Sequence, residues 1–114
     1  MAAVEIDARD EGDVRILKIT GALDALNATQ LNQVLRDAIG MGHSKIICDF
    51  VGVSYVCSAV IGALFSKNKQ ARDANGGIVL AGPSVEVRTI FDSMEMAAVF
   101  TITETVAEAL EAFA

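Results

Sequence analysis

The sequence predicts an α/β fold: a mixed β-sheet of about five strands, opened by a hairpin, with about four helices packed on it. Three observations support this. The chain has 114 residues and 53% hydrophobic content, enough to bury one core without disulfide or metal support. Two alternating segments at the start predict a hairpin. The remainder alternates strand and helix patterns without a repeat or linker. We therefore expect one domain over residues 1–114.

The opening strands are "VEIDA" at 4–8 and "VRILKIT" at 14–20, which alternate apolar and polar residues around the turn "RDEGD". "GALDAL" then leads into the first helix, for which Asn27 and Gln30 predict a capping-box-like start. "GMG" at 40–42 ends that helix. Its expected buried stripe is Leu31, Val34, Leu35, Ala38 and Ile39.

"KIICDFVGV" at 45–53 is almost continuously apolar, which is typical of a central strand covered on both faces. Helical spacing follows, and "NGG" at 75–77 ends the second helix. The residues expected to face inward are Val60, Ile61, Leu64, Phe65 and Ala71. Those expected to face outward are Lys67, Asn68, Lys69, Gln70 and Arg72.

"GIVLAG" at 77–82 predicts another buried strand, after which Pro83 and Ser84 indicate a helix start. "VFTIT" at 99–103 predicts a last short strand, and "ETVAEALEAFA" at 104–114 predicts a closing amphipathic helix. The third helix should share one face among Val87, Ile90, Phe91 and Met94, and the last should turn Val106, Ala109, Leu110 and Phe113 inward.

Charge and composition argue against several classes of function. A net charge of −6 without a Lys or Arg cluster disfavours a nucleic-acid or anionic-membrane partner. The acidic N-terminal segment does not resemble a signal peptide, and the uncharged run at 51–65 is too short to span a membrane, so we expect a cytoplasmic protein. Cys48 and Cys57 lack the spacing of a disulfide framework and are expected to be free thiols.

Known enzyme signatures fit poorly. "GMGHSK" at 40–45 lacks the spacing of a phosphate-binding P-loop and ends a helix, so it predicts a turn. His43 is the only histidine, which excludes a His-based metal cluster. Cys57 near a helix start would suit a reactive thiol, but residues 58–66 contain no phosphate-binding arginine and no C-x-x-C pair. We expect no catalytic residue, cofactor or metal; a thiol enzyme using Cys57 remains the distant alternative.

Ser58 follows Cys57 where the apolar strand gives way to helical spacing. One interpretation is that Ser58 is an N-cap that accepts a hydrogen bond from an orphan amide of the helix. The other is that its hydroxyl is phosphorylated, since a helix N-terminus tolerates added negative charge. The local pattern leaves both open.

Four segments together resemble the stand-alone STAS domains that serve as bacterial anti-sigma factor antagonists. They are "GALD" at 21–24, "CDFVGVSYVCSAVIGALFSKNKQA" at 48–71, "GGIVLAGPSVEVRTIFDSM" at 76–94 and "FTITET" at 100–105. The resemblance runs from about Val4 to the last helix. The middle segment in that family reads D-F-x-x-V-x-x-x-D-S-S/T-G-L-G-x-L, and a partner kinase, itself the anti-sigma factor, phosphorylates its first serine.

The resemblance places Ser58 on that serine, and Asp24 on the acid of the family's G-x-L-D motif. Asp49 falls on the acid of the strand motif, Gly62 and Leu64 match the pattern, and Ile61 replaces a leucine conservatively. Three positions depart from the family pattern. Cys57 stands where the family has Asp, Ala59 where it has Ser or Thr, and Val60 where it has Gly.

The function implied by the resemblance is a non-enzymatic switch. Unmodified protein would capture an anti-sigma serine kinase and free a sigma factor, phosphorylation of Ser58 would release the kinase, and a serine phosphatase would reset it. The alternative is a STAS binding or scaffold module that is not phosphorylated, of the stressosome or ligand-sensing type. The expected partner-binding residues are Asp24, Tyr55, Cys57, Ser58, Ala59 and Val60.

Overall fold

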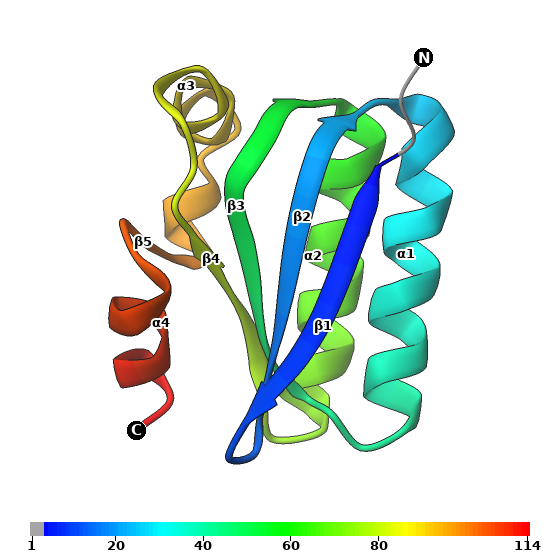
Figure 1. Cartoon of the computed structure of the whole chain (residues 1–114), viewed down its shortest axis with the longest axis vertical. Helices are drawn as coiled ribbons and strands as arrows, with labels where there is room; N and C mark the ends of the chain where they lie inside the picture. The colour runs from blue at the N-terminus through cyan, green and yellow to red at the C-terminus, as the bar shows by residue number, and fades with distance from the viewer. Residues whose placement is uncertain (1–3) are drawn as a thin grey trace.

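The computed structural model describes residues 4–114 and contains a five-stranded mixed sheet with strand order β1-β2-β3-β4-β5 (Figure 1). β1 pairs antiparallel with β2, while β2, β3, β4 and β5 run parallel to one another. The predicted hairpin and mixed sheet are therefore confirmed. The strands are β1 (Glu5–Glu11), β2 (Val14–Leu23), β3 (Lys45–Val56), β4 (Gly77–Ala81) and β5 (Thr101–Thr103).

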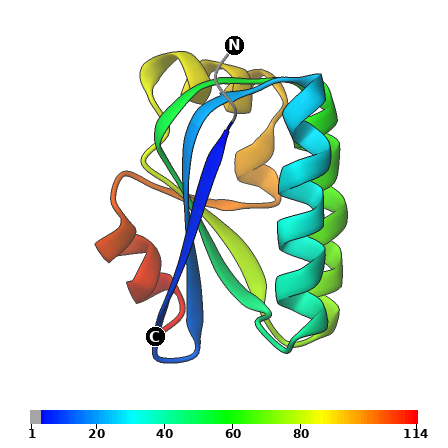
Figure 2. The same cartoon turned by 45° about the vertical axis from the view of Figure 1, so that its right-hand side comes forward.

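The helices cover both faces of the sheet. α1 and α2 lie side by side on one face, α4 lies on the other, and α3 packs at the end of the sheet where the parallel strands finish (Figures 1 and 2). In the part of the chain described, no helix is long and apolar enough to cross a membrane. The helices are α1 (Ala25–Gly40), α2 (Ser58–Asp73), α3 (Val85–Ser93) and α4 (Val106–Ala112), with a 3-10 turn at Met96–Ala98.

Two apolar clusters hold these layers together, and β3 contributes to both. Cys48 and Phe50 point into the larger cluster beneath α1 and α2, where the Phe50 and Phe91 rings meet edge to face with centroids 5.4 Å apart. Ile47 points the other way, into the smaller cluster beneath Ala109 of α4. This confirms a central strand covered on both faces over residues 46–50, whereas Val51 and Gly52 of the predicted run are exposed.

The hairpin strands and β3 are longer than predicted. The hairpin turn needs only Gly12, whose φ is +61°, and Asp13, so the charged residues before them remain in β1. Arg15 Nε lies 2.8 Å from Asp10 Oδ1, and Lys45 Nζ lies 2.8 Å from Asp13 Oδ2. These exposed ion pairs allow charged residues to occupy strand positions near the turn.

The predicted capping box of α1 is wrong. Asp24 is the N-cap, and its side chain accepts from the backbone N–H of Asn27 at 3.0 Å. Asn27 therefore lies inside the first turn and donates its amide to the carbonyl of Ala22, while Gln30 donates to the carbonyl of Val4. Both side chains tie α1 to the strands instead of closing its end.

Three side chains lie on the opposite side from that predicted. Lys67 and Asn68 are buried, because α2 is flanked by α1 and β4 along its length. Met94 is 46% exposed because α3 ends at Ser93 and Met94 only follows as its C-cap. The other assigned outward residues of α2, namely Lys69, Gln70 and Arg72, are exposed as expected.

Candidate functional site

The carboxyl ends of β2 and β3 bring two distant segments of the chain together. Leu23 pairs with Val56 in the sheet register, and the backbone N–H of Cys57 donates to the carbonyl of Leu23 at 2.9 Å. Asp24 directly follows one of these residues and Ser58 the other. The two polar side chains predicted from sequence are thus placed at the same end of the sheet, where α1 and α2 both begin (Figure 1).

Ser58 is the first residue of α2, and its side chain is exposed. The N-cap is Cys57, so the interpretation of Ser58 as an N-cap is wrong. Among residues 4–114, α2 is the only α-helix whose N-cap side chain makes no hydrogen bond; α1, α3 and α4 are capped by Asp24, Ser84 and Thr105. The amide end of α2 is therefore left open beside the Ser58 hydroxyl.

As at Asp24 of α1, the backbone carbonyl of Cys57 makes only the hydrogen bonds that begin an α-helix. It accepts from the amides of Val60 at 3.2 Å and Ile61 at 3.3 Å. Val60 is fully buried in the larger cluster and offers no surface to a partner. The start of α2 is consequently held by packing, with Ser58 and Ala59 on its outer side.

Asp24 has a structural role in addition to any role in binding. Its carboxylate caps α1, and the residue is only partly exposed. Replacing an Asp cap by alanine costs about 0.5–2 kcal/mol of stability, whereas asparagine caps equally well. Asp24→Asn therefore separates the charge of this side chain from its capping function.

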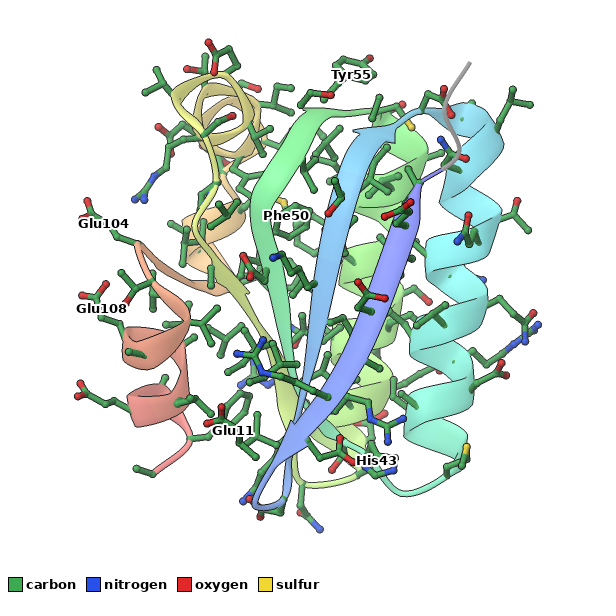
Figure 3. All side chains as sticks on the ribbon, in the orientation of Figure 1. Glu11, His43, Phe50, Tyr55, Glu104 and Glu108 are labelled. Atoms are coloured by element: carbon green, nitrogen blue, oxygen red, sulfur yellow. The ribbon has the colours of Figure 1, made fainter. Side chains whose placement is uncertain are left out.

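Two exposed apolar side chains belong to the same segments as Asp24 and Ser58. Tyr55 is 49% exposed at the end of β3 (Figure 3), and Leu26 in the first turn of α1 is 78% exposed. Leu26 was missed at the sequence level; the available signal was that it lies five residues before Leu31 and so falls outside the helical stripe. We call the surface formed by Asp24, Leu26, Tyr55, Ser58 and Ala59 the Ser58 edge.

The two cysteines differ in exposure. Cys48 is completely buried, and burial together with the neighbouring Asp49 carboxylate raises the pKa of its thiol to about 12. This agrees with a thiol that serves only packing. Cys57 is partly exposed next to Ser58. Residues 4–114 contain no group of three or more His, Cys, Asp or Glu side chains arranged to hold a metal ion.

Asp49 shapes the strand that leads to the site. It is only 7% exposed, and its Oδ1 accepts from the backbone N–H of Val51 at 3.1 Å. The β2–β3 register shifts at this point, between Lys18 and Thr20. The carboxylate thus satisfies an amide within the β-bulge, which fixes the path of β3 toward Tyr55 and Ser58.

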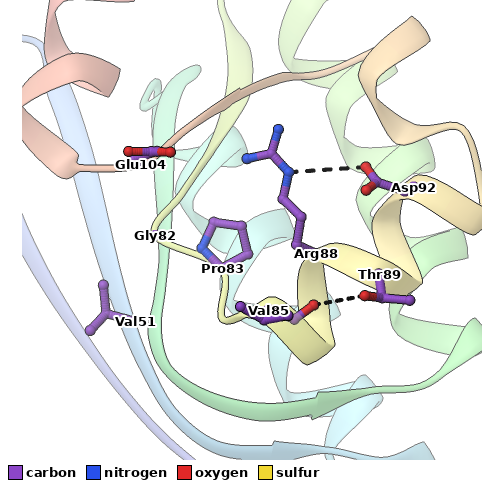
Figure 4. A pocket seen from close by; sticks show the side chains of 8 residues that line it. All are labelled: Val51, Gly82, Pro83, Val85, Arg88, Thr89, Asp92 and Glu104. Atoms are coloured by element: carbon purple, nitrogen blue, oxygen red, sulfur yellow. Dashed lines mark hydrogen bonds and ion pairs between the residues drawn. The ribbon is translucent and has the colours of Figure 1, made fainter.

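A surface pocket of about 550 Å³ lies near the same end of the sheet, between β3, the β4–α3 connection and Glu104. Figure 4 shows the long side chain of Arg88 crossing it, with Nε 4.0 Å from Asp92 Oδ1. Gly82 forms part of its floor with φ +67°, and a Cβ there would come within 2.3 Å of Val51 Cγ2. The positive φ strains any residue other than glycine at this position.

Comparisons with known proteins agree with the fold and relate it to one class of regulator. The STAS domain family model matches residues 5–109. A protein from Bordetella bronchiseptica named as anti-sigma factor antagonist BtrV is 25% identical over 95 residues, covering 83% of this chain and 82% of BtrV.

Solved structures give the same result at the level of the fold. A Thermotoga maritima protein described as an anti-sigma factor antagonist superposes with a TM-score of 0.88 at 22% identity, and the match covers 93% of this chain and 92% of that chain. SpoIIAA superposes in its unphosphorylated form with a TM-score of 0.75 and in its phosphorylated form, from Bacillus, with 0.74. Each SpoIIAA structure is 20% identical in sequence to this chain, and each match covers 96% of this chain. The matches cover 97% of the unphosphorylated and 100% of the phosphorylated SpoIIAA chain.

Proposed function

Because the chain belongs to the STAS domain family, we propose that it is an anti-sigma factor antagonist whose Ser58 edge captures an anti-sigma serine kinase and so frees a sigma factor. Phosphorylation of Ser58 by that kinase would end the interaction, and a serine phosphatase would restore it. The observation that carries this proposal is an exposed serine at the uncapped start of α2, among exposed apolar side chains.

The position of Ser58 suits phosphoryl transfer. Its hydroxyl is exposed, so the oxygen can attack the γ-phosphorus of ATP held by the kinase; the new O–P bond forms as the bond to ADP breaks, and the hydroxyl proton leaves to a base. The product dianion would lie at the positive end of the α2 dipole, where first-turn amides can donate to it. The fold can therefore accept the modification.

The chemistry of the Ser58 edge indicates what the partner must supply. Leu26 and Tyr55 offer apolar surface, and Asp24 offers one carboxylate. The segments at 21–35 and 51–66, which contribute this surface, contain no Lys or Arg. A partner with an apolar centre and a basic side chain facing Asp24 would complement this surface. The same surface has no cation with which to neutralise phosphate, so modification would weaken a complex.

The direct test uses an anti-sigma serine kinase as the partner. We expect incubation with that kinase and ATP to add one phosphate, which mass spectrometry maps to Ser58 and which Ser58→Ala abolishes. Asp24→Asn should weaken kinase binding while leaving the thermal melt unchanged, because the cap is retained. Phosphate confined to other serines or threonines would contradict the switch. Undiminished binding by Asp24→Asn, with binding abolished by changes on α4, would place the footprint elsewhere.

A second candidate, the ligand-sensing module, is favoured by the pocket at Arg88. Its guanidinium holds Asp92 only loosely, at 4.0 Å, so a ligand group could compete for it. Under this alternative, small-molecule binding would raise the melting temperature, Arg88→Gln would remove the effect, and Ser58→Ala would retain it.

A further inference from the structure

Asn68 and Arg72 lie in the half of α2 farther from Ser58. β5 pairs with β4 only from Val79 onward, so the first residues of β4 form an open sheet edge. The side chain of Asn68 covers this edge: its Oδ1 accepts from the backbone N–H of Ile78 at 2.9 Å. Asn68 is only 4% exposed, so the amide is held inside the structure by a hydrogen bond that a neighbouring strand would otherwise make.

This hydrogen bond fixes which way the Asn68 amide faces. Only the oxygen can accept from Ile78, so the Nδ2 group and its two hydrogens face the remaining direction. Nδ2 has no hydrogen-bond acceptor within residues 4–114. Every completely enclosed side-chain nitrogen or oxygen in these residues does have a hydrogen-bond partner. The donor is therefore not fully enclosed, and Asn68 lines two hollows of about 360 and 370 Å³.

Arg72 lies beside the same amide. A Cβ at Gly77 would be 3.7 Å from Arg72 Cγ and 3.7 Å from Asn68 Oδ1, so both side chains pass over this glycine. The five ion pairs in the described part of the chain use Arg9, Arg15, Lys45, Lys69 and Arg88. Arg72 is therefore a cation without an acidic partner there, although the chain carries a net charge of −6.

The composition of the 360 Å³ hollow favours an anion, whereas the 370 Å³ hollow includes Asp73. The lining of the 360 Å³ hollow includes Arg72, the Asn68 amide and the Thr101 hydroxyl, and no acidic side chain. Its apolar wall comes from Val99 and Phe113. A planar guanidinium next to an amide donor is suited to an oxyanion, which can accept from both at once.

We propose that this hollow binds a small ligand carrying one carboxylate or phosphate group, with Arg72 and Asn68 Nδ2 donating to the oxyanion and a short apolar portion packed on Val99 and Phe113. The site is independent of the proposed switch. Asn68 lies ten residues and Arg72 fourteen residues beyond Ser58 on one helix, which corresponds to about 15–21 Å along its axis at 1.5 Å per residue.

The test is a titration of the whole chain, followed by amide and side-chain NMR, with butyrate as the carboxylate probe and inorganic phosphate as the phosphate probe. We expect saturable shifts at the Asn68 side-chain amide, Gly77 and Thr101. Saturation with butyrate alone identifies a carboxylate site, and saturation with phosphate alone identifies a phosphate site; each supports the proposal.

Two variants make the assignment specific. Arg72→Gln removes the charge of an exposed side chain, and Asn68→Asp keeps an oxygen for Ile78 but replaces the donor by an acceptor. Each should weaken binding at least about tenfold. Arg36→Gln, on the exposed side of α1 and outside every ion pair of the described residues, is the matched control and should bind normally. Shifts that never saturate, or that are equal in Arg72→Gln and Arg36→Gln, would overturn the proposal.

Discussion

Phosphorylation of Ser58 should change binding far more than it changes folding. Ser58 is exposed, so the phosphate remains in solvent in the free protein. Its interaction with the α2 dipole contributes about 0.3–1 kcal/mol at an exposed terminus, and that contribution favours the anion. We therefore expect the phosphorylated protein to melt at the same temperature as the unmodified one, or slightly above it.

The effect on a complex has the opposite sign. Docking on the Ser58 edge would remove water from nearly two added charges beside the Asp24 carboxylate, and the segments at 21–35 and 51–66 that form this surface contain no Lys or Arg. A net penalty of about 3 kcal/mol would lower affinity on the order of a hundredfold, at about 1.4 kcal/mol per factor of ten. Ser58→Asp adds one charge with a different shape and should lose less, while Ser58→Ala should keep full affinity.

Calorimetry against the anti-sigma kinase measures all four forms, and a thermal melt of each form alone is the control. A loss of affinity accompanied by an equal loss of stability would mean that the phosphate disturbs the fold. Equal affinities for phosphoserine, Ser58→Asp and Ser58→Ala would refute the reasoning and favour the unphosphorylated scaffold.

Three further outcomes are expected. Iodoacetamide at neutral pH should label Cys57 and leave Cys48 unmodified until the protein unfolds, because Cys48 is buried and the pKa of its thiol is raised to about 12. Mass spectrometry of digests measures the labelling, and labelling of Cys48 in the folded protein would contradict the prediction. Asn68→Ala should destabilise by about 1–3 kcal/mol in urea titrations because a buried β4 amide loses its acceptor, whereas Asn68→Asp should lose less. The hydrogen bond from Arg15 lowers the pKa of Asp10. The stabilisation from this pair is therefore present above the unfolded carboxyl pKa of about 4 and is lost as pH falls through the lower folded pKa. Asp10→Asn should flatten the acid side of the curve of unfolding free energy against pH, and an unchanged curve would exclude the pair as a contributor.

The fold was predictable because hydrophobic spacing records which face of each element is buried. β3 reads as continuously apolar since both of its faces are covered, and α4 reads as amphipathic since it covers only the smaller cluster. The placement of Asp24 and Ser58 at the same end of the sheet also followed from topology, because parallel neighbouring strands finish at one edge.

Hydrogen-bonding roles were not predictable in the same way. The spacing of Asn27 and Gln30 suggests that Asn27 is the N-cap, but the N-cap is Asp24, whose carboxylate accepts from the backbone N–H of Asn27. Asn68 looks like a solvent-facing residue, but a three-residue β5 leaves Ile78 without a strand partner, and the asparagine supplies the acceptor. In each case the decisive partner is a backbone group whose position depends on the tertiary structure.

The departures from the family pattern at Cys57, Ala59 and Val60 can be compared by their effects on the stability of the first turn of α2. The acid that the resemblance expects at position 57 would be an effective N-cap, and loss of such a cap costs about 1 kcal/mol. Burial of a valine side chain stabilises by about 1.5–3 kcal/mol, and Val60 is fully buried in the larger cluster. Packing at position 60 can therefore offset the missing cap and keep the first turn ordered, so the substitutions act chiefly on the surface. They remove one negative charge next to Ser58 and leave its first-turn amides without a side-chain acceptor. A kinase that recognises this chain must then rely on Leu26, Tyr55 and the carboxylate of Asp24, and not on an acid adjacent to the serine.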